Sequence, residues 1–416
     1  MNKQSLKDFD PVIANAIKNE INRQESGLEM IPSENFVSIA ALEALGSVVT
    51  NKYSEGYPGK RYYGGCEHID TIEQTAIDRA KELFGAEHVN IQPLSGAPMN
   101  VAVYFGLLEP GDTILGMDLS HGGHLTHGHP VTHMAKIFNF IRYKTNQEGN
   151  IDLDNLQEMA NTHKPKMILV GYSAYSRDID YENIKRIADS VGAITMADVS
   201  HIGGLIAGGE MNNPVPLFDV VTTTTHKTLR GARGGMIMCK EKYAKKIDKA
   251  VFPGLQGGPH ENNIAASAVA FKEAQEPAFK EYCKQIKKNA KALEIVFKEK
   301  EYKIMFGGTS NHLLLIDVTP KGITGKEAQQ ALDKAGITIN KNMIPDDPRR
   351  PMDPSGIRLG TPALTTRGMK EKEMEQIAHM IDEVIMNHQN DEILEKIKQQ
   401  TEALAKQFPL YPELQV

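Results

Sequence analysis

Short apolar runs alternate with amphipathic segments between residues 85 and 240. The runs are rich in β-branched residues, which favours strands. The candidate strands are Thr113–Met117, Met167–Val170, Ala193–Ala197, Val220–Thr225 and Met236–Cys239. Tyr181–Val191, between two of these runs, has apolar residues at helical spacing. This alternation predicts an α/β fold with a mostly parallel sheet covered by helices on both faces.

The segments before this region carry helical patterns and one irregular stretch. Residues 1–30 read as an amphipathic helical arm, with apolar residues at Val12, Ile13, Ala16, Ile17 and Ile21. Asp70, with Glu73 three residues on, predicts the N-cap of a helix that Gly85 ends. Asn51–Gly65 contains four glycines and four tyrosines. That composition predicts a loop that makes contacts through its aromatic rings.

The C-terminal third predicts a second α/β unit. Phe279–Lys298 reads as a long helix leading into it, and Lys370–Met386 is amphipathic. Thr324 and Glu327 form a capping-box pattern for a helix that Gly336 ends. The candidate strands are Tyr302–Met305, His312–Asp317 and Ile337–Ile339.

The length of 416 residues exceeds what one hydrophobic core usually fills. We therefore predict three parts: a helical arm over residues 1–30, a large domain over 31–285 and a smaller α/β domain over 286–416.

Composition narrows the class of protein. The net charge of −6 argues against a nucleic-acid-binding face, and no apolar run approaches the roughly 18 residues of a membrane span. Charged residues stand near the start, where a signal peptide would be apolar. Three distant cysteines, Cys66, Cys239 and Cys283, indicate neither a disulfide framework nor a metal site. These features predict a cytoplasmic protein.

Two ionisable residues follow candidate strands. Lys227 comes directly after the β-branched run Val220–Thr225, and Asp198 ends the run that begins at Ala193. The carboxyl ends of strands in an open α/β sheet line the ligand crevice. A lysine there can hold pyridoxal phosphate, and a carboxylate can pair with its pyridine nitrogen. Taken singly, Lys227 reads more simply as a solvated charge, and Asp198 reads equally well as the cap of a helix or turn.

Small residues and an arginine add weaker signals. Ser95, Gly96 and Ala97 open a helical pattern, which suits a phosphate because backbone N–H groups point at it. Arg358 stands between apolar neighbours and needs a partner. That partner is either the α-carboxylate of an amino acid or an internal Asp or Glu.

Histidines cluster at His121, His124 and His127. The two glycines within this stretch and the lack of an adjacent acidic or cysteine ligand argue against zinc. Stacking on an aromatic cofactor explains one of the three, and the others read as structural.

Together these stretches resemble the serine hydroxymethyltransferase family over nearly the whole chain. The matching motifs are Pro32–Asn35, Asn51–Gly65, Gly122–Gly128, Thr222–Leu229, Phe252–Gly254, Gln256–Pro259, Asn340–Asn342 and Gly356–Ala363. The resemblance implies a fold-type I pyridoxal-phosphate enzyme with a large cofactor domain and a smaller C-terminal domain. It further implies a homodimer with shared active sites, with a tetramer also open. The implied reaction interconverts serine plus tetrahydrofolate and glycine plus 5,10-methylenetetrahydrofolate.

The resemblance also assigns roles, with Lys227 as the Schiff-base lysine and Glu55 as the acid/base group. The implied catalytic residues are Lys227, Glu55, Tyr63 and His226. The implied cofactor-binding residues are Tyr53, Ser95, Gly96, Ala97, His124, Ser173, Asp198, His201, Lys227, Arg233 and Gly258, with Tyr53, Glu55 and Gly258 reaching the partner subunit's site. Ser33, Glu55, Tyr63, His201 and Arg358 would hold the amino acid. Glu55, Tyr62, Leu119, Gly123, Leu125 and Asn342 would form the folate site, and no metal is implied.

One departure from the family pattern leaves alternatives open. Ala97 stands where the family commonly has a second serine of the phosphate cradle, which removes one hydroxyl contact. A folate-independent aldolase, a hydroxymethyltransferase for another substrate or pterin, and a noncatalytic relative are the competing hypotheses.

Overall fold

The computed structural model describes residues 3–412. Residues 1 and 2 of the predicted arm, and the last four residues of the predicted C-terminal domain, lie outside that range. The α-helices are α1 (Leu6–Phe9), α2 (Pro11–Ser26), α3 (Ile39–Leu45), α4 (Glu67–Phe84), α5 (Gly96–Leu107), α6 (Leu153–His163), α7 (Tyr181–Val191), α8 (Gly203–Ala207), α9 (Ala244–Lys249), α10 (Glu261–Gln275), α11 (Pro277–Glu299), α12 (Gly325–Lys334), α13 (Pro362–Thr366), α14 (Glu371–Met386) and α15 (Asp391–Ala405). The strands are β1 (Leu28–Glu29), β2 (Gly56–Tyr57), β3 (Lys60–Arg61), β4 (His88–Asn90), β5 (Thr113–Met117), β6 (Asn139–Tyr143), β7 (Met167–Gly171), β8 (Ile194–Asp198), β9 (Val220–Thr224), β10 (Gly235–Cys239), β11 (Lys303–Ile304), β12 (Leu313–Asp317), β13 (Ile337–Thr338), β14 (Asn340–Asn342) and β15 (Gly356–Gly360).

A seven-stranded sheet in the described residues has the order β4-β10-β9-β8-β7-β5-β6. The strands from β9 to β6 are parallel to their neighbours, and β10 is antiparallel to both β9 and β4. Every strand predicted between residues 113 and 239 is present within two residues of its predicted ends. The prediction of a mostly parallel sheet is confirmed.

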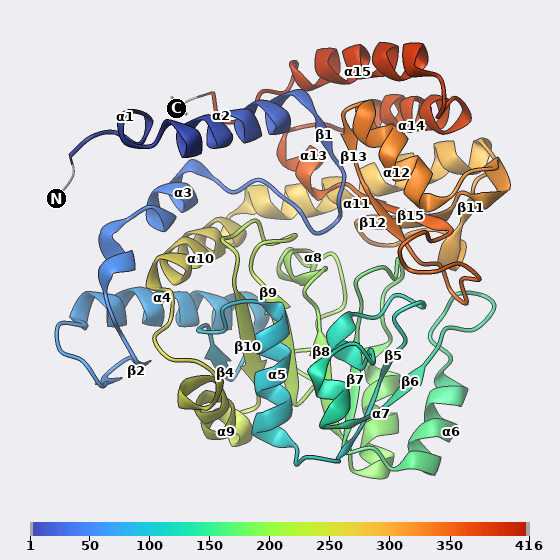
Figure 1. The fold of residues 1–416 in the computed structure, drawn as a ribbon. Helices are drawn as coiled ribbons and strands as arrows, with labels where there is room; N and C mark the ends of the chain where they lie inside the picture. Colours follow the sequence, from blue (N-terminus) through green and yellow to red (C-terminus); the bar gives the residue numbers. More distant parts are fainter. Residues whose placement is uncertain (1–2, 413–416) are drawn as a thin grey trace.

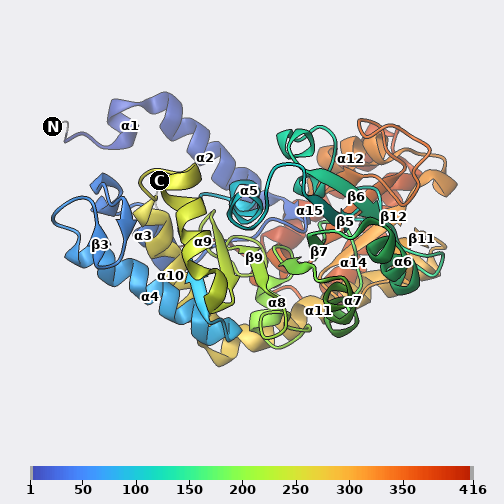
Figure 2. The ribbon, with the colours of Figure 1, turned by 90° about the horizontal axis from the view of Figure 1, so that it is seen from below.

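Helices cover both faces of this sheet, as Figures 1 and 2 show. Alternate residues of one strand face opposite cores: Ile168 and Val170 pack with α4, α6, α7 and α10, whereas Met167 and Leu169 pack with α5 and α9. Because successive side chains of a strand point to opposite faces, a strand buried on both sides needs an unbroken apolar run. This is why the sequence runs read as strands without polar alternation.

A second sheet in the described residues is antiparallel, with the order β11-β12-β15-β14. In Figure 1 it lies with α12, α14 and α15 at the upper right. Helix α11 joins the two units, since Cys283 and Ile286 pack in the core of the large sheet and Leu293 and Phe297 in the core of the small one. The division near residue 285 remains a prediction, with this helix running through it.

The predicted strand at Ile337–Ile339 is present in part, but it lies outside the four-stranded sheet. As β13 it pairs in parallel with β1, so Leu28 and Ile337 lie side by side. The chain directly after the N-terminal arm is thereby attached to the C-terminal core, where Leu28 and Met30 are fully buried.

The predicted helical arm is present as α1 and α2, but its apolar face is not buried. Val12 is 74% exposed, and Ile13 and Ile17 are also exposed, while Ala14 is the buried residue of α2. The pattern predicted the helix correctly, and the described chain supplies no surface that covers its apolar residues.

The prediction of an N-cap at Asp70 is wrong. Helix α4 begins one turn earlier, at Glu67, after an N-cap at Cys66. Asp70 lies within the helix and accepts hydrogen bonds from Arg61 and from the backbone N–H of Gly59. A buried guanidinium needs a carboxylate more than a helix terminus does, because helix N–H groups have alternative partners. The end at Gly85, in a left-handed conformation, is confirmed.

The capping box at Thr324 and Glu327 is confirmed, with both reciprocal hydrogen bonds formed at the start of α12. Within residues 3–412, no helix combines the length and the apolar character that crossing a membrane would require.

Candidate active site

A cavity of about 460 Å³ opens at the carboxyl ends of β7, β8 and β9. We call it the Lys227 cavity. Its lining residues are Ser33, Glu34, Ser95, Gly96, Ala97, His124, Tyr172, Ser173, Asp198, Ser200, His201, Thr224, His226, Lys227, Arg233 and Arg358. Lys227 and Asp198, predicted to share one crevice, therefore do so, because adjacent parallel strands end at the same edge.

The half-buried side chain of Lys227 offers its amine to this cavity. Its backbone carbonyl accepts a hydrogen bond from Asn35, and its amine has no hydrogen-bond or ion-pair partner within residues 3–412. Burial lowers the pKa of Lys227 to about 8, opposed by Asp198 and assisted by Arg358. A substantial fraction of this amine is neutral near pH 8, which is the form that attacks a carbonyl carbon.

Asp198 is a buried carboxylate held from both oxygens. Oδ1 accepts from the backbone and hydroxyl of Ser200, and Oδ2 accepts from Asn100 at 2.8 Å and contacts Nε2 of His127 at 3.1 Å. Burial alone raises the pKa of Asp198, but the hydrogen bond and charge of His127 outweigh it and leave the pKa well below its usual range. Asp198 is therefore a fixed negative charge on one side of the cavity.

The three clustered histidines lie in different surroundings. His124 lines the cavity, and burial, followed by His127, lowers its pKa to about 4. His127 holds Asp198, and His121 bonds to Thr145 away from the cavity. Within residues 3–412, no group of three or more His, Cys, Asp or Glu is placed to hold a metal.

His226 precedes Lys227 and also lines the cavity. Burial lowers its pKa to about 3, and the nearby cations of Lys227 and Arg233 act in the same direction. Its Nδ1 is buried without a hydrogen-bond partner in the described residues. A neutral imidazole thus lines the same cavity as the amine of Lys227.

Arg358 reaches the cavity from β15 of the small sheet. Its guanidinium donates to the Oδ1 of Asn340 at 3.1 Å and to the backbone carbonyl of Ser173. Burial lowers its pKa to about 10, and within residues 3–412 it pairs with no Asp or Glu. Of the two partners that the sequence left open, the internal carboxylate is absent, so this cation faces the cavity with charge unpaired.

The N-terminus of α5 closes another side of the cavity. Ser95 is the N-cap of this helix, and its hydroxyl makes no capping hydrogen bond. A Cβ added at Gly96 would lie 3.0 Å from Cγ2 of Thr224, so glycine keeps the backbone close to β9. Helix N–H groups and a free hydroxyl together suit an anion such as phosphate.

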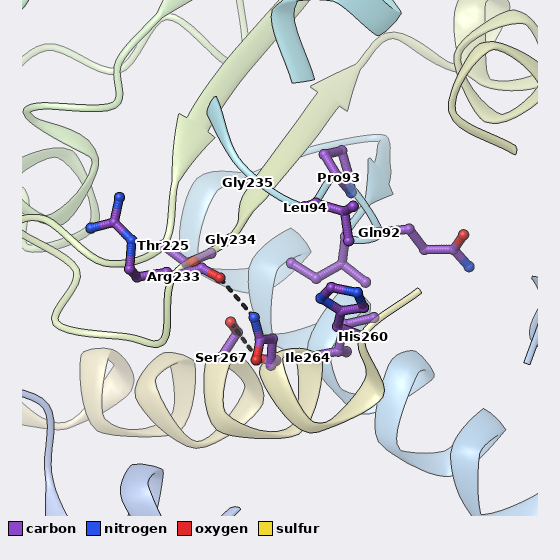
Figure 3. Close-up of a pocket in the computed structure, with 12 residues that line it drawn as sticks. Gln92, Pro93, Leu94, Thr225, Arg233, Gly234, Gly235, His260, Ile264 and Ser267 are labelled. Atoms are coloured by element: carbon purple, nitrogen blue, oxygen red, sulfur yellow. Dashed lines mark hydrogen bonds between the residues drawn. The ribbon is translucent and has the colours of Figure 1, made fainter. Parts of the chain in front are cut away.

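Arg233 stands at this same end and borders a second, narrow pocket of about 20 Å³. Asn263 of α10 donates to the backbone carbonyl of Arg233 at 3.0 Å, and Ser267 supports Asn263 (Figure 3). Figure 3 shows the Arg233 side chain extending away from His260 and Ile264. Helix α10 thereby fixes the backbone from which this guanidinium extends.

Four of the predicted folate residues, Leu119, Gly123, Leu125 and Asn342, do not line the cavity. Leu119, Gly123 and Leu125 occupy the loop after β5, where Ser173 donates to the carbonyl of Gly123 at 3.0 Å. Gly123 has no room for a side chain, since a Cβ would lie 2.3 Å from the carbonyl oxygen of Met117.

Asn342 is the last residue of β14, two residues beyond the Asn340 that holds Arg358. Residues two apart on a strand share a face. Asn342 is thereby on the same side of β14 as the partner of Arg358.

Besides the four folate residues described above, five predicted site residues lie outside the Lys227 cavity. Tyr53, Glu55, Tyr62 and Tyr63 belong to residues 53–63, which we call the tyrosine segment, and Gly258 lies against the ring of Tyr53. The three tyrosines are 56%, 73% and 46% exposed. The chain therefore brings these residues together, but not with its own Lys227.

The tyrosine segment is anchored by Arg61. The guanidinium donates to the backbone carbonyls of Ser54 and Gly56 at 2.8 and 2.9 Å, and to Asp70 and Glu73 at 2.8 and 2.6 Å. Its side chain is 4% exposed, so these bonds are shielded from water. Beside these anchored residues Tyr53 and Tyr62 stay exposed, whereas Tyr57 turns inward and donates to the backbone carbonyl of Asp248 at 2.7 Å.

Several residues in and behind the cavity were not predicted as site residues. Ser200 and Asn100 hold Asp198, and Asn340 holds Arg358. Their signal was weak, because a polar residue behind a site is recognised only once its partner's position is known. Tyr172 directly follows β7, and its place at a strand end was the available clue.

A family comparison agrees with this geometry: the model of serine hydroxymethyltransferase matches residues 6–381. The chain belongs to the serine hydroxymethyltransferase family. Its members are pyridoxal-phosphate transferases that take tetrahydrofolate as cosubstrate and interconvert serine and glycine. The predicted family, fold class and enzyme class are thereby confirmed.

The cavity residues fit pyridoxal phosphate on three structural observations. Within the described residues the amine of Lys227 has no hydrogen-bond or ion-pair partner, and Asp198 keeps a negative charge in the same cavity. The free Ser95 hydroxyl and the N-terminus of α5 provide an anion site, with Arg233 also lining that cavity. The amine, carboxylate and anion site match the three polar parts of this cofactor.

Proposed function

We propose that this chain transfers the hydroxymethyl carbon between serine and tetrahydrofolate in an active site shared by two copies of the chain. The observation that carries the proposal is the separation between the Lys227 cavity and the tyrosine segment. The cavity has the cations and the amine, while the same chain leaves Tyr53, Tyr62 and Tyr63 exposed, with the half-buried Glu55 among them.

Lys227 and Asp198 would hold the cofactor, with His124 against its ring. When bound, pyridoxal phosphate supplies an electron sink for the bond broken at the α-carbon of the amino acid. Ser95, Gly96 and Arg233 would bind its phosphate. Ala97 lines the same end and contributes no hydroxyl, so backbone N–H groups carry more of that contact.

Arg358 would bind the α-carboxylate of serine or glycine. A guanidinium offers paired N–H donors in a plane, which match the two oxygens of a carboxylate. Its present partners are neutral oxygens of Asn340 and Ser173, so the positive charge remains available to a ligand. Ser33 and His201 line the cavity and would complete this subsite.

Glu55 would act in the partner's cavity as the group that moves the hydroxyl proton of serine. In its own chain it lies beside Tyr53, whose pKa is raised chiefly by the charge of Glu55. Tyr53, Tyr63 and Gly258 would enter the partner's site together with it. A dimer is further supported by the exposed apolar residues of α2, which a second copy could cover.

Tetrahydrofolate would bind at the mouth of the cavity. Leu119, Gly123 and Leu125 lie in the loop that also positions His124, and Asn342 ends β14 of the small sheet. Glu55 and Tyr62 of the partner would complete the folate site. The cytoplasm is the proposed location, supported by three buried cysteines that form no disulfide.

The test is serine cleavage by the purified enzyme with and without tetrahydrofolate. We expect cleavage to depend strongly on tetrahydrofolate and glycine to form in equal amount with the methylene product. Equal rates with and without it would favour a folate-independent aldolase. Cleavage supported better by a modified pterin would change the carrier but keep the reaction class.

A further inference from the structure

Two buried histidines meet where the two sheets approach each other. His201 follows β8 and lines the Lys227 cavity, whereas His312 directly precedes β12 of the small sheet. Nδ1 of His201 lies 3.3 Å from Nε2 of His312, and the ring planes differ by 30°. The two residues are 3% and 0% exposed. His312 has no part in the roles proposed above.

Both imidazoles are neutral. Burial lowers the pKa of His201 well below its usual value and that of His312 to about 3, and the cations of Lys227 and Arg358 act in the same direction. A neutral imidazole carries one N–H and one lone pair. The contact between the rings therefore requires one histidine to donate and the other to accept.

The surroundings of His312 decide which one donates. Its other nitrogen, Nδ1, is buried and has no hydrogen-bond partner within residues 3–412. If His201 donated, Nδ1 of His312 would be an N–H buried without an acceptor, an arrangement that folded proteins avoid. If His312 donates from Nε2, Nδ1 keeps only a lone pair, and no N–H is left unpaired in the protein interior.

We propose that His312 is a positioning residue that donates its Nε2–H to Nδ1 of His201 and so makes His201 present an N–H to the cavity. His201 then donates from Nε2 to an anionic oxygen of the ligand, and it does not act as a base. The amino-acid carboxylate and the oxygens of the cofactor are acceptors of this kind. The catalytic consequence rests on the proposed function, whereas the tautomer does not.

The tautomer is measured by ¹⁵N NMR of the holoenzyme with ¹⁵N-labelled histidine, since protonated and unprotonated ring nitrogens resonate far apart. His201→Asn identifies the signals of His201. We expect Nε2 of His201 to carry the proton in the wild type. His312→Gln, whose amide retains a donor, should preserve this pattern, and His312→Phe, which has no donor, should lose it.

Kinetics separate positioning from a structural role. In His312→Phe we expect the KM for serine to rise about ten- to a hundredfold, the effect of losing one hydrogen bond to a charged group. The kcat should change less, and His312→Gln should stay within about threefold of wild type. A purely structural residue would lower the unfolding temperature in both variants without restoring KM in His312→Gln.

Two results would overturn the proposal: a wild-type His201 with its proton on Nδ1, or His201 signals unchanged in His312→Phe. If His312→Phe does not fold, the position of the His201 proton in the wild type and in His312→Gln decides. A wild type with the expected signals but no serine cleavage would refute the proposed function and leave the tautomer standing.

Discussion

The cations of the Lys227 cavity and the cation of the tyrosine segment differ in whether they have charged partners. In the cavity, the amine of Lys227 has no partner among the described residues, and Arg358 donates to neutral oxygens of Asn340 and Ser173. In the segment, Arg61 is satisfied by two carboxylates and two backbone carbonyls. The cavity thus keeps its cations available to a ligand, whereas the segment uses its cation to hold a shape.

This difference bears on the location of the proposed active site. Unpaired buried charges are costly, so they persist where a ligand completes them. Exposed aromatic residues on a rigid segment persist where another surface covers them. The residues of the tyrosine segment do not line the Lys227 cavity of their own chain. In the proposed dimer, a second copy of the chain brings the two regions together.

The largest expected effect is in the cavity, from Lys227→Ala. Serine cleavage should be abolished and the visible absorbance band of the bound cofactor lost, because no other amine in the cavity can hold it covalently. Absorbance and turnover are measured after adding pyridoxal phosphate. The exposed Lys245→Ala serves as control. A band that persists in Lys227→Ala would contradict the assignment of this lysine.

In the tyrosine segment, Glu55→Gln should lower serine turnover by roughly 10²- to 10⁴-fold, the usual contribution of a general acid or base. Cofactor absorbance and glycine binding should stay near wild type, because the amide keeps the size of the side chain. Steady-state kinetics and a glycine titration check this. Near-normal turnover would move the proton-transfer role to another residue.

Mixing the two inactive variants tests the comparison itself. Suppose that each active site takes Lys227 from one copy and Glu55 from the other. A dimer of one Lys227→Ala copy and one Glu55→Gln copy then has one site with both residues intact and one site with both changed. Random reassociation makes about half of the dimers mixed, so about a quarter of wild-type activity should return. No recovery, with exchange of subunits verified, would place both residues in one chain's site.

Arg61→Gln should destabilise the fold by about 3–5 kcal/mol, because it leaves Asp70 and Glu73 without their cation in a shielded place. Urea unfolding measures this. Lys60→Gln, an exposed neighbour on the same strand, should stay within about 0.5 kcal/mol of wild type. Similar stability for both variants would show that the anchor is not needed for the fold.

The smallest effect concerns Glu261, which accepts a hydrogen bond from Ser54 of the tyrosine segment. Burial raises the pKa of Glu261 to about 7, and Glu73 adds to the rise. The folded protein therefore binds this proton more tightly than the unfolded chain, and the stabilisation is lost as the pH rises from about 4.5 to about 7.

Glu261→Gln removes this titration. The free energy of unfolding of the wild type should fall by about 1–3 kcal/mol relative to the variant between pH 5 and 8. Urea unfolding at both pH values, with exposed Glu299→Gln as control, measures it. Parallel pH dependence of wild type and Glu261→Gln would exclude a raised pKa at this residue.

Local sequence patterns alone predicted several of the helices and strands. The strand Thr113–Met117 follows from a short apolar run, and the helix Tyr181–Val191 follows from apolar residues at helical spacing. The capping box at Thr324 follows from hydrogen bonds within four residues. The position of Lys227 at a strand end followed in the same way, because the β-branched run before it is a local signal.

Only the tertiary structure decided the partners. Asp70 binds Arg61 instead of capping a helix, β13 pairs with β1 rather than joining the small sheet, and Arg358 has no carboxylate partner within residues 3–412. His312 contacts His201 across 111 residues of chain. Such pairs depend on which surfaces meet when two cores pack, and no periodicity within one segment carries that information.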